Sequence, residues 1–116
     1  MSQNIKQPNS WVILEIKQDN DTPIYKILAS WYGGYLGGDE WKLNSGIKEV
    51  KRSEEFVDFI GHSGSIYRCH RNCERFSGIM ASVYSGFRNA ISEDGTINAS
   101  IEPILLEEFD KLEEFK

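Results

Sequence analysis

The stretch that decides the fold runs from residue 11 to residue 31 and reads Trp11-Val-Ile-Leu-Glu-Ile-Lys-Gln-Asp-Asn-Asp-Thr-Pro-Ile-Tyr-Lys-Ile-Leu-Ala-Ser-Trp31. Its first part, Trp11 to Lys17, is mostly apolar with partial alternation, which predicts a strand buried on one face and partly on the other. Residues 19 to 23 have the composition of a turn. Ile24 to Trp31 predicts a second strand, with alternate residues on one face: Tyr25, Ile27, Ala29 and Trp31. The stretch therefore predicts a β-hairpin.

Further strands are predicted on the carboxyl side of this hairpin. Trp41 to Leu43 predicts a short extended piece, and Asn44 to Gly46 predicts a turn. Ile47 to Arg52 alternates apolar with charged residues, as half-exposed strands do. Glu55 to Ile60 and Ser65 to His70 predict another hairpin around the turn Gly61 to Gly64. The chain up to His70 is therefore predicted to be an antiparallel β-meander of five to six strands, forming a curled sheet or a small barrel.

The pattern becomes helical at Phe76. Apolar residues now recur at helical spacing: Phe76, Ile79, Met80, Val83, Tyr84, Phe87 and Ile91. This stripe predicts a packing helix over 77 to 91, with Ser77 as its cap. Small residues form a second row, four positions apart: Gly78, Ser82, Gly86 and Ala90. We expect this row to pack closely on the sheet, and the alternative is a groove for a partner helix.

The carboxyl-terminal segment predicts a short strand from Thr96 to Ile101 and then a helix. Pro103 suits the first turn of a helix. One face of this helix would be apolar: Ile104, Leu105, Leu106, Phe109, Leu112 and Phe115. Acidic residues near its end oppose the helix dipole, so we expect this amphipathic helix to fray unless its apolar face is docked. The predicted fold class is α+β.

Composition places the chain among ordinary globular domains. It has 116 residues, of which 40% are hydrophobic and 27% are charged, and one core of this size needs no disulfide or metal. Residues 1 to 10 are predicted to be a flexible tail, and residues 11 to 116 a single domain. No stretch has the length of a membrane span or the apolar centre of a signal peptide, so the expected location is cytoplasmic, with Cys69 and Cys73 as free thiols.

Charge argues against a general nucleic-acid binder. The net charge is −5, and from Glu93 onward the chain has eight acidic and two basic residues. Nucleic-acid-binding domains are normally much more basic. A local basic cluster, Arg68 to Arg75, keeps weak nucleic-acid binding open as an alternative.

Catalytic and metal-binding patterns are incomplete. Gly61 to Ser65 resembles a hydrolase nucleophile elbow, but that motif needs a fifth-position glycine and a following helix. His62, Cys69, His70 and Cys73 could be imagined as zinc ligands. Cys69 and His70 are adjacent, however, and on a strand they would point to opposite faces. We therefore predict no catalytic residue, metal or cofactor, with a small hydrolase using Ser63 or Cys73 and a histidine as the enzymatic alternative.

The most unusual stretch is Ser30-Trp-Tyr-Gly-Gly-Tyr-Leu-Gly-Gly-Asp-Glu-Trp41, which contains four aromatic and four glycine residues. Its structural interpretation is a bent strand with Trp31 and Trp41 closing the ends of a small barrel. Its functional interpretation is an exposed aromatic patch, since Trp, Tyr and Arg commonly anchor protein interfaces.

Two stretches carry a resemblance: Gly33-Gly-Tyr-Leu-Gly-Gly-Asp-Glu-Trp-Lys-Leu-Asn-Ser-Gly-Ile47 and Gly61-His-Ser-Gly-Ser-Ile-Tyr-Arg-Cys-His70. This pattern resembles short uncharacterised prophage-type proteins of bacteria. The resemblance implies an accessory product of a mobile element, a class that often binds and blocks a host or rival protein. It transfers no catalytic residue.

These observations lead to one preferred hypothesis about function. We expect a non-enzymatic binding module that binds and modulates a host or defence protein. Its predicted binding residues are Trp31, Tyr32, Tyr35 and Trp41 as anchors, with Arg68 and Arg71 orienting the partner. A homodimer formed through the carboxyl-terminal helix is a second possibility, and no membrane partner is expected.

Overall fold

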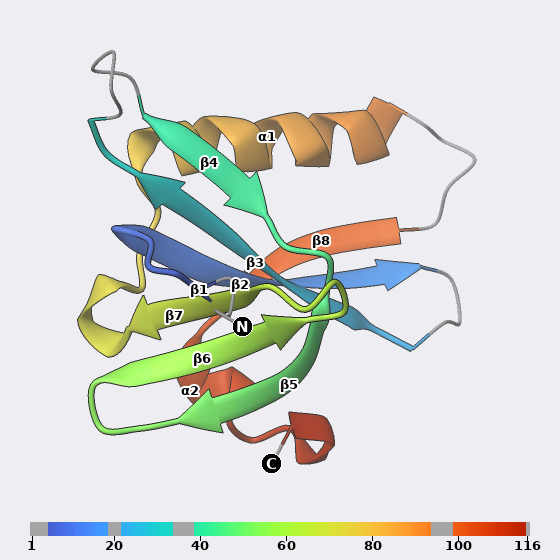
Figure 1. Cartoon of the computed structure of the whole chain (residues 1–116). Coiled ribbons are helices and arrows are strands. Elements are labelled where there is room, and N and C mark those ends of the chain that lie inside the picture. The colour runs from blue at the N-terminus through green and yellow to red at the C-terminus, as the bar shows by residue number, and fades with distance from the viewer. Residues whose placement is uncertain (1–4, 19–21, 34–38, 94–98, 116) are drawn as a thin grey trace.

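A computed structural model describes residues 5–18, 22–33, 39–93 and 99–115. It shows two four-stranded sheets packed against each other, with a long helix on one of them (Figure 1). Sheet A has the order β1 (Ile5–Lys6), β7 (Ile66–His70), β6 (Phe56–Gly61), β5 (Ile47–Arg52). Sheet B has the order β4 (Glu40–Leu43), β3 (Ile24–Trp31), β2 (Ser10–Gln18), β8 (Ala99–Ile104). All pairs are antiparallel except β1 with β7.

The predicted hairpin of β2 and β3 is confirmed, and it forms the centre of sheet B. Trp11 and Ile13 of β2 face sheet A, whereas Val12 and Leu14 face the helix. All four side chains are buried because both faces of this part of the sheet are covered. The nearly continuous apolar run of β2 is therefore explained by its central position.

The main core lies between the two sheets. Sheet B contributes Trp11 and Tyr25, and sheet A contributes Phe59 and Tyr67, among other buried residues. Ring contacts connect the layers, with the centroids of Trp11 and Phe59 5.5 Å apart. A second, smaller core lies between sheet B and the long helix.

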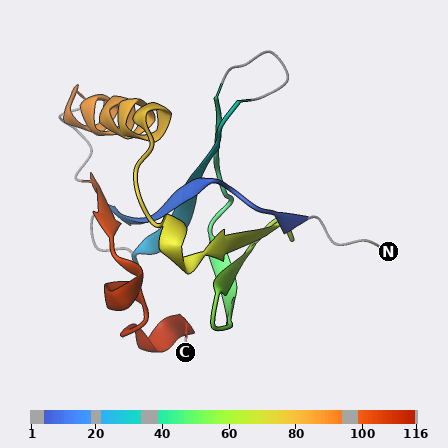
Figure 2. The ribbon, with the colours of Figure 1, turned by 90° about the vertical axis from the view of Figure 1, so that its left-hand side faces the viewer.

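Helix α1 (Gly78–Glu93) covers the outer face of sheet B (Figure 2). The predicted helix and its cap are confirmed, since the Ser77 hydroxyl accepts a hydrogen bond from Met80 N at 3.3 Å. Met80 is fully buried on the sheet. Within the described ranges, neither α1 nor a shorter helix has the length and apolar character needed to cross a bilayer.

The row of small residues on α1 does not pack on the sheet, so that prediction was wrong. Gly78, Ser82, Gly86 and Ala90 are exposed, and an added Cβ at Gly78 or Gly86 would meet nothing within 4 Å. Consecutive helix residues point about 100° apart. The row therefore turns to solvent, because the larger stripe beside it occupies the sheet.

The sheets do not close into a barrel, and the meander is interrupted. β2, β3 and β4 are consecutive neighbours in sheet B, and β5, β6 and β7 are consecutive neighbours in sheet A. Between them, Asn44 to Gly46 carries the chain from one sheet to the other. Gly46 has a φ of 120°, and a Cβ there would lie 3.1 Å from His62. This turn at residues 44 to 46 therefore separates β2, β3 and β4 in sheet B from β5, β6 and β7 in sheet A.

The predicted carboxyl-terminal amphipathic helix is also corrected. Pro103 lies in edge strand β8, opposite Leu14, where a missing N–H is tolerated. Only α2 (Leu106–Phe109) and the 3-10 turn η2 (Glu113–Phe115) follow. Leu106, Phe109 and Phe115 are buried in the main core. These apolar side chains are thus used within the chain, which removes the feature on which the predicted homodimer was based.

The amino-terminal tail is shorter than predicted. Ile5 and Lys6 pair with Ile66 and Tyr67 as β1, and β2 begins at Ser10. Residues 1–4 lie outside the described part of the chain. Strand pairing with β7, which is distant in sequence, explains why a polar segment without periodicity joins the fold.

Tyr25 provides a pH test of this core. Burial, aided by the hydrogen bond that its hydroxyl donates to Glu15 at 2.8 Å, raises the pKa of Tyr25 to about 12. The folded state then keeps a proton that the unfolded state loses near pH 10. We compare the free energy of unfolding of wild type with that of Tyr25→Phe. The difference in favour of wild type should stay constant up to about pH 10 and decrease between about pH 10 and pH 12. Denaturant titration at several pH values measures this difference, and a constant difference would contradict the assignment.

Candidate functional site

The aromatic segment is divided between the two faces of sheet B. In the β3–β4 register, Trp31 pairs with Glu40, and Ser30 pairs with Trp41. Because paired residues share a face and neighbours along a strand alternate, Trp31 faces sheet A and Trp41 faces α1. The two indoles therefore do not form one continuous patch.

Trp31 is half-buried at the end of the main core. Its indole Nε1 donates to the Gln7 carbonyl at 3.0 Å, and its ring meets that of Tyr67 at a centroid distance of 6.4 Å. Tyr67 is buried, and this burial raises the pKa of its hydroxyl. Trp31 thus connects β3 with β7 and with the segment that follows β1, within an open sandwich and not at the end of the barrel that the structural interpretation expected.

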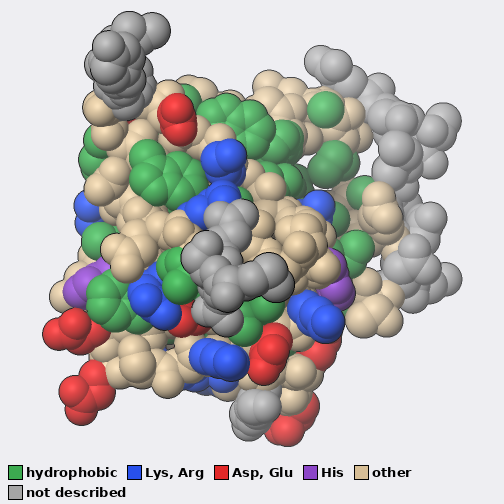
Figure 3. Space-filling model, in the orientation of Figure 1, with side chains coloured by type: hydrophobic (Ala, Val, Ile, Leu, Met, Phe, Trp, Pro, Cys, Tyr) green, Lys and Arg blue, Asp and Glu red, His purple; other side chains and the backbone are tan. Residues whose placement is uncertain are grey.

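Trp41 and Tyr32 are the exposed aromatics of the segment, at 41% and 46%. The Trp41 ring lies against Phe87 of α1, with 6.0 Å between centroids. The Tyr32 hydroxyl lies 2.5 Å from the Ser10 hydroxyl. Tyr35 falls outside the described residues. Hydrophobic side chains gather over β4 and α1, with basic side chains directly beside them (Figure 3).

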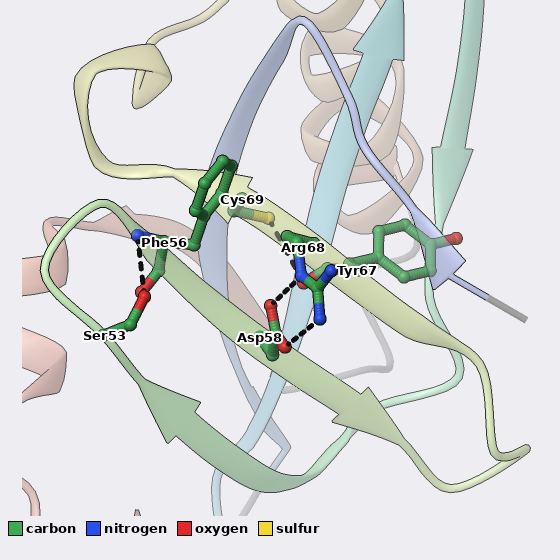
Figure 4. Close-up of polar contacts among 6 residues, drawn as sticks. All are labelled: Ser53, Phe56, Asp58, Tyr67, Arg68 and Cys69. Carbon is green, nitrogen blue, oxygen red and sulfur yellow. Dashed lines mark hydrogen bonds and ion pairs between the residues drawn. The ribbon is translucent and has the colours of Figure 1, made fainter. Parts of the chain in front are cut away.

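Arg68 and Arg71 lie apart from these rings. Arg68 donates two hydrogen bonds of 3.0 Å to the Asp58 carboxylate on the outer face of sheet A (Figure 4), and this pairing raises the pKa of its guanidinium. Arg71 donates to the Ser53 carbonyl at 2.9 Å. Since Tyr67 faces inward, its neighbour Arg68 must face outward. The five predicted binding residues that the structure describes are therefore not brought together on one surface.

A groove opens where edge strands β1 and β4 meet at the end of the sandwich. We define this β1–β4 groove by two adjoining hollows of about 460 and 430 Å³, which both include Lys6 and Lys42. Trp31 and Tyr67 line its apolar part, and Glu40 stands on its rim. On β4, Glu40 and Lys42 point into the groove because they pair with Trp31 and Ala29, which face sheet A.

Asn44 lies at the inner end of this groove, together with Ser45, Ser63 and Ser65. Its side chain is buried, and its Oδ1 accepts hydrogen bonds from Ile27 N at 2.9 Å and Gly46 N at 3.3 Å. These two bonds fix the orientation of the amide. Its Nδ2 is buried and has no hydrogen-bond partner.

The groove is mixed in charge, with two ammonium groups and one carboxylate. Within the described ranges, Lys42 makes no ion pair, and its side chain is exposed. An exposed ammonium beside the half-buried ring of Trp31 provides both charge and apolar surface. Chemically, the groove can hold a chain segment or a small molecule that carries an acceptor group.

No catalytic arrangement forms around Ser63 or Cys73 in the described part of the chain. Ser63 N donates to Ser45 Oγ at 3.0 Å, and neither histidine contacts the Ser63 hydroxyl. His70 Nδ1 accepts from Asn72 N at 3.1 Å, and Cys73 packs against the core. Burial raises the pKa of Cys69 well above its usual value. Across all the described residues, no group of three or more His, Cys, Asp or Glu side chains could hold a metal ion.

The basic cluster is largely engaged within the protein. Asp58 neutralises Arg68, and Arg75 reaches the carbonyls of Asn72 and Asn9 at 3.4 and 3.5 Å. Arginines that contact phosphates need free donors. The nucleic-acid alternative therefore gains no support from this geometry.

The sequence analysis did not single out several residues of the groove, among them Lys6, Lys42 and Asn44. Asn44 was assigned only to a turn, and Lys6 to the tail. The alternation of Glu40 and Lys42 on a short extended piece was the available signal for an edge strand. Nothing in the sequence indicates that β1 lies opposite β4.

Comparisons with protein-family models, curated proteins and solved structures found no match for this chain. The resemblance to prophage-type proteins therefore stays a prediction. Function has to be argued from the groove and from the edge strand beside it.

Proposed function

We propose that this chain is a non-enzymatic binding protein that holds an extended segment of another protein along edge strand β4. The observation that carries the proposal is the exposed edge of β4, flanked by Trp41 on one face and by the β1–β4 groove on the other. Among the described strands, β4 pairs with β3 alone.

Strand addition accounts for the division of the aromatic segment. An edge strand presents unpaired N–H and C=O groups, and an extended peptide can pair with them. The side chains of the added strand alternate between faces. One set would contact Trp41 and Phe87, and the other would enter the groove beside Lys42. Indoles on opposite faces can therefore anchor a single segment.

The partner is proposed to be a host or defence protein, and the resemblance to prophage-type proteins is the reason for naming this class. Trp41 is the expected energetic centre because tryptophan is enriched among residues that dominate binding. Lys42 also discourages indiscriminate edge pairing, since a lysine on an edge strand disfavours aggregation.

Capture from host extract tests this function. Trp41→Ala should weaken retention of the partner at least about tenfold, because truncating a binding anchor commonly costs about 2 kcal/mol. The matched control is Phe76→Ala, which removes another exposed ring, at 37%. Quantitative mass spectrometry of the retained proteins measures the effect.

A protein retained by wild type and by Phe76→Ala, but lost with Trp41→Ala, is the expected result. Equal retention by all three would show that β4 is not the binding edge. Circular dichroism confirms that each variant is folded before the comparison is made.

A further inference from the structure

The buried amide of Asn44 is a donor without an acceptor. Asn44 is 5% exposed, and its Oδ1 is committed to the N–H groups of Ile27 and Gly46. Turning the amide over would place its NH2 group against those two donors, so the orientation is determined. Nδ2 is left without a partner. Buried polar groups in proteins are normally paired, so an orphaned donor needs an explanation.

Gly61 lies beside this donor at a closely packed position that leaves no room for a larger residue. A Cβ on Gly61 would lie 3.5 Å from Asn44 Nδ2 and 2.9 Å from Ser45 Oγ. Gly61 follows Val57 and Phe59 at alternate positions of β6, so this face looks into the sandwich. The amide and the Ser45 hydroxyl thus converge on a point that any other residue at position 61 would fill.

Other donors surround the inner end of the groove. Lys42 and Ser63 line the same hollow as Asn44. Ammonium and amide groups are hydrogen-bond donors, and a hydroxyl can also donate. The complementary ligand is therefore an acceptor that carries negative charge.

We propose that the inner end of the β1–β4 groove binds a carboxylate carried by an acidic side chain of the docked segment, held by Asn44 Nδ2 and Lys42 Nζ. This inference rests on the proposed function, because strand addition along β4 would direct alternate side chains toward Lys42. A carboxylate fits better than a phosphate, since Glu40 on the same groove would repel a doubly charged group. In this proposal the carboxylate displaces the exposed Ser45 hydroxyl, which gives up the hydrogen bond that it accepts from Ser63 N.

Acetate is the probe, and the side-chain amide signals of Asn44 are the readout. We expect acetate titrated into 15N-labelled protein at constant ionic strength to shift one Asn44 Nδ2 proton downfield with saturation. Lys42→Ala should weaken apparent acetate affinity about two- to fivefold, as expected for one exposed ion pair. Lys48→Ala, which removes an exposed lysine outside the groove, should leave the affinity unchanged. Gly61→Ala should abolish the response, because the added Cβ would lie 2.9 Å from Ser45 Oγ and 3.5 Å from Asn44 Nδ2, where the carboxylate has to enter.

The outcomes of these titrations and of the capture experiment test the carboxylate site and the docked segment separately. No movement of the Asn44 signals, or an equal response in Lys42→Ala, overturns the carboxylate site, whereas the Trp41-dependent capture remains a separate result. A response to inorganic phosphate as strong as that to acetate overturns the choice of carboxylate. Retention unaffected by Trp41→Ala, together with an acetate response, overturns the docked segment and leaves a site for a small carboxylic acid. The unchanged backbone spectrum of each variant shows that it is folded.

Discussion

Replacing Trp11 with alanine is expected to lower the free energy of unfolding by about 3 to 5 kcal/mol. Trp11 is fully buried at the contact between the sheets, with its ring 5.5 Å from that of Phe59. Its indole Nε1 donates to the His70 carbonyl at 2.8 Å. The substitution therefore removes a large apolar surface, opens a cavity and leaves a partly buried carbonyl without its donor.

Urea denaturation followed by circular dichroism measures this loss. Trp41→Ala is the matched control, because its 41% exposed ring leaves a much smaller cavity, and we expect it to cost within about 1 kcal/mol. Similar midpoints for the two variants would contradict the placement of Trp11 at the centre of the sandwich.

Phe109→Ala is expected to have an effect of the same size, about 3 to 5 kcal/mol. Phe109 is fully buried, and its ring meets those of Tyr25, Phe59 and Phe115 at centroid distances of 5.7, 5.8 and 5.0 Å. The carboxyl-terminal segment thus closes one end of the main core. Removing this ring should destabilise the whole domain, because it leaves a cavity at the end of the core between the two sheets.

Leu105→Ala is the control for this prediction, since Leu105 is 60% exposed. Its cost should stay within about 0.5 kcal/mol, as for most surface substitutions. The same denaturation experiment measures both variants. A small effect of Phe109→Ala would instead indicate that the apolar face of this segment is not docked, the case in which the sequence pattern predicted fraying.

Local patterns were sufficient for most of the strands and for the long helix. The alternation in β3 correctly predicted which residues face the core, and Ser77 was recognised as the cap of α1. These features depend on residues close in sequence, where side-chain periodicity and backbone hydrogen bonding act together. The same reasoning failed for the carboxyl-terminal segment, because Ile101 to Ile104 pairs with β2 and that tertiary pairing outweighs local helix preference.

The candidate site was only partly accessible to such reasoning. The aromatic segment was correctly marked as unusual, but the face that each ring occupies follows from the β3–β4 register. Lys6 and Lys42 meet in one groove although 36 positions separate them in the chain. Asn44 looked like a turn residue, and its burial depends on the packing of one sheet against the other.

The sequence by itself determined the strands from β2 to β7, the helix that starts after Ser77 and the core face of the first hairpin. Each of these is specified by residues close together in the chain. Tertiary structure alone decided the split into two sheets, the extended course of β8, the opposite faces of Trp31 and Trp41, and the groove between β1 and β4. These features arise where segments distant along the chain bury their surfaces together, so the free energy that selects them belongs to no single segment.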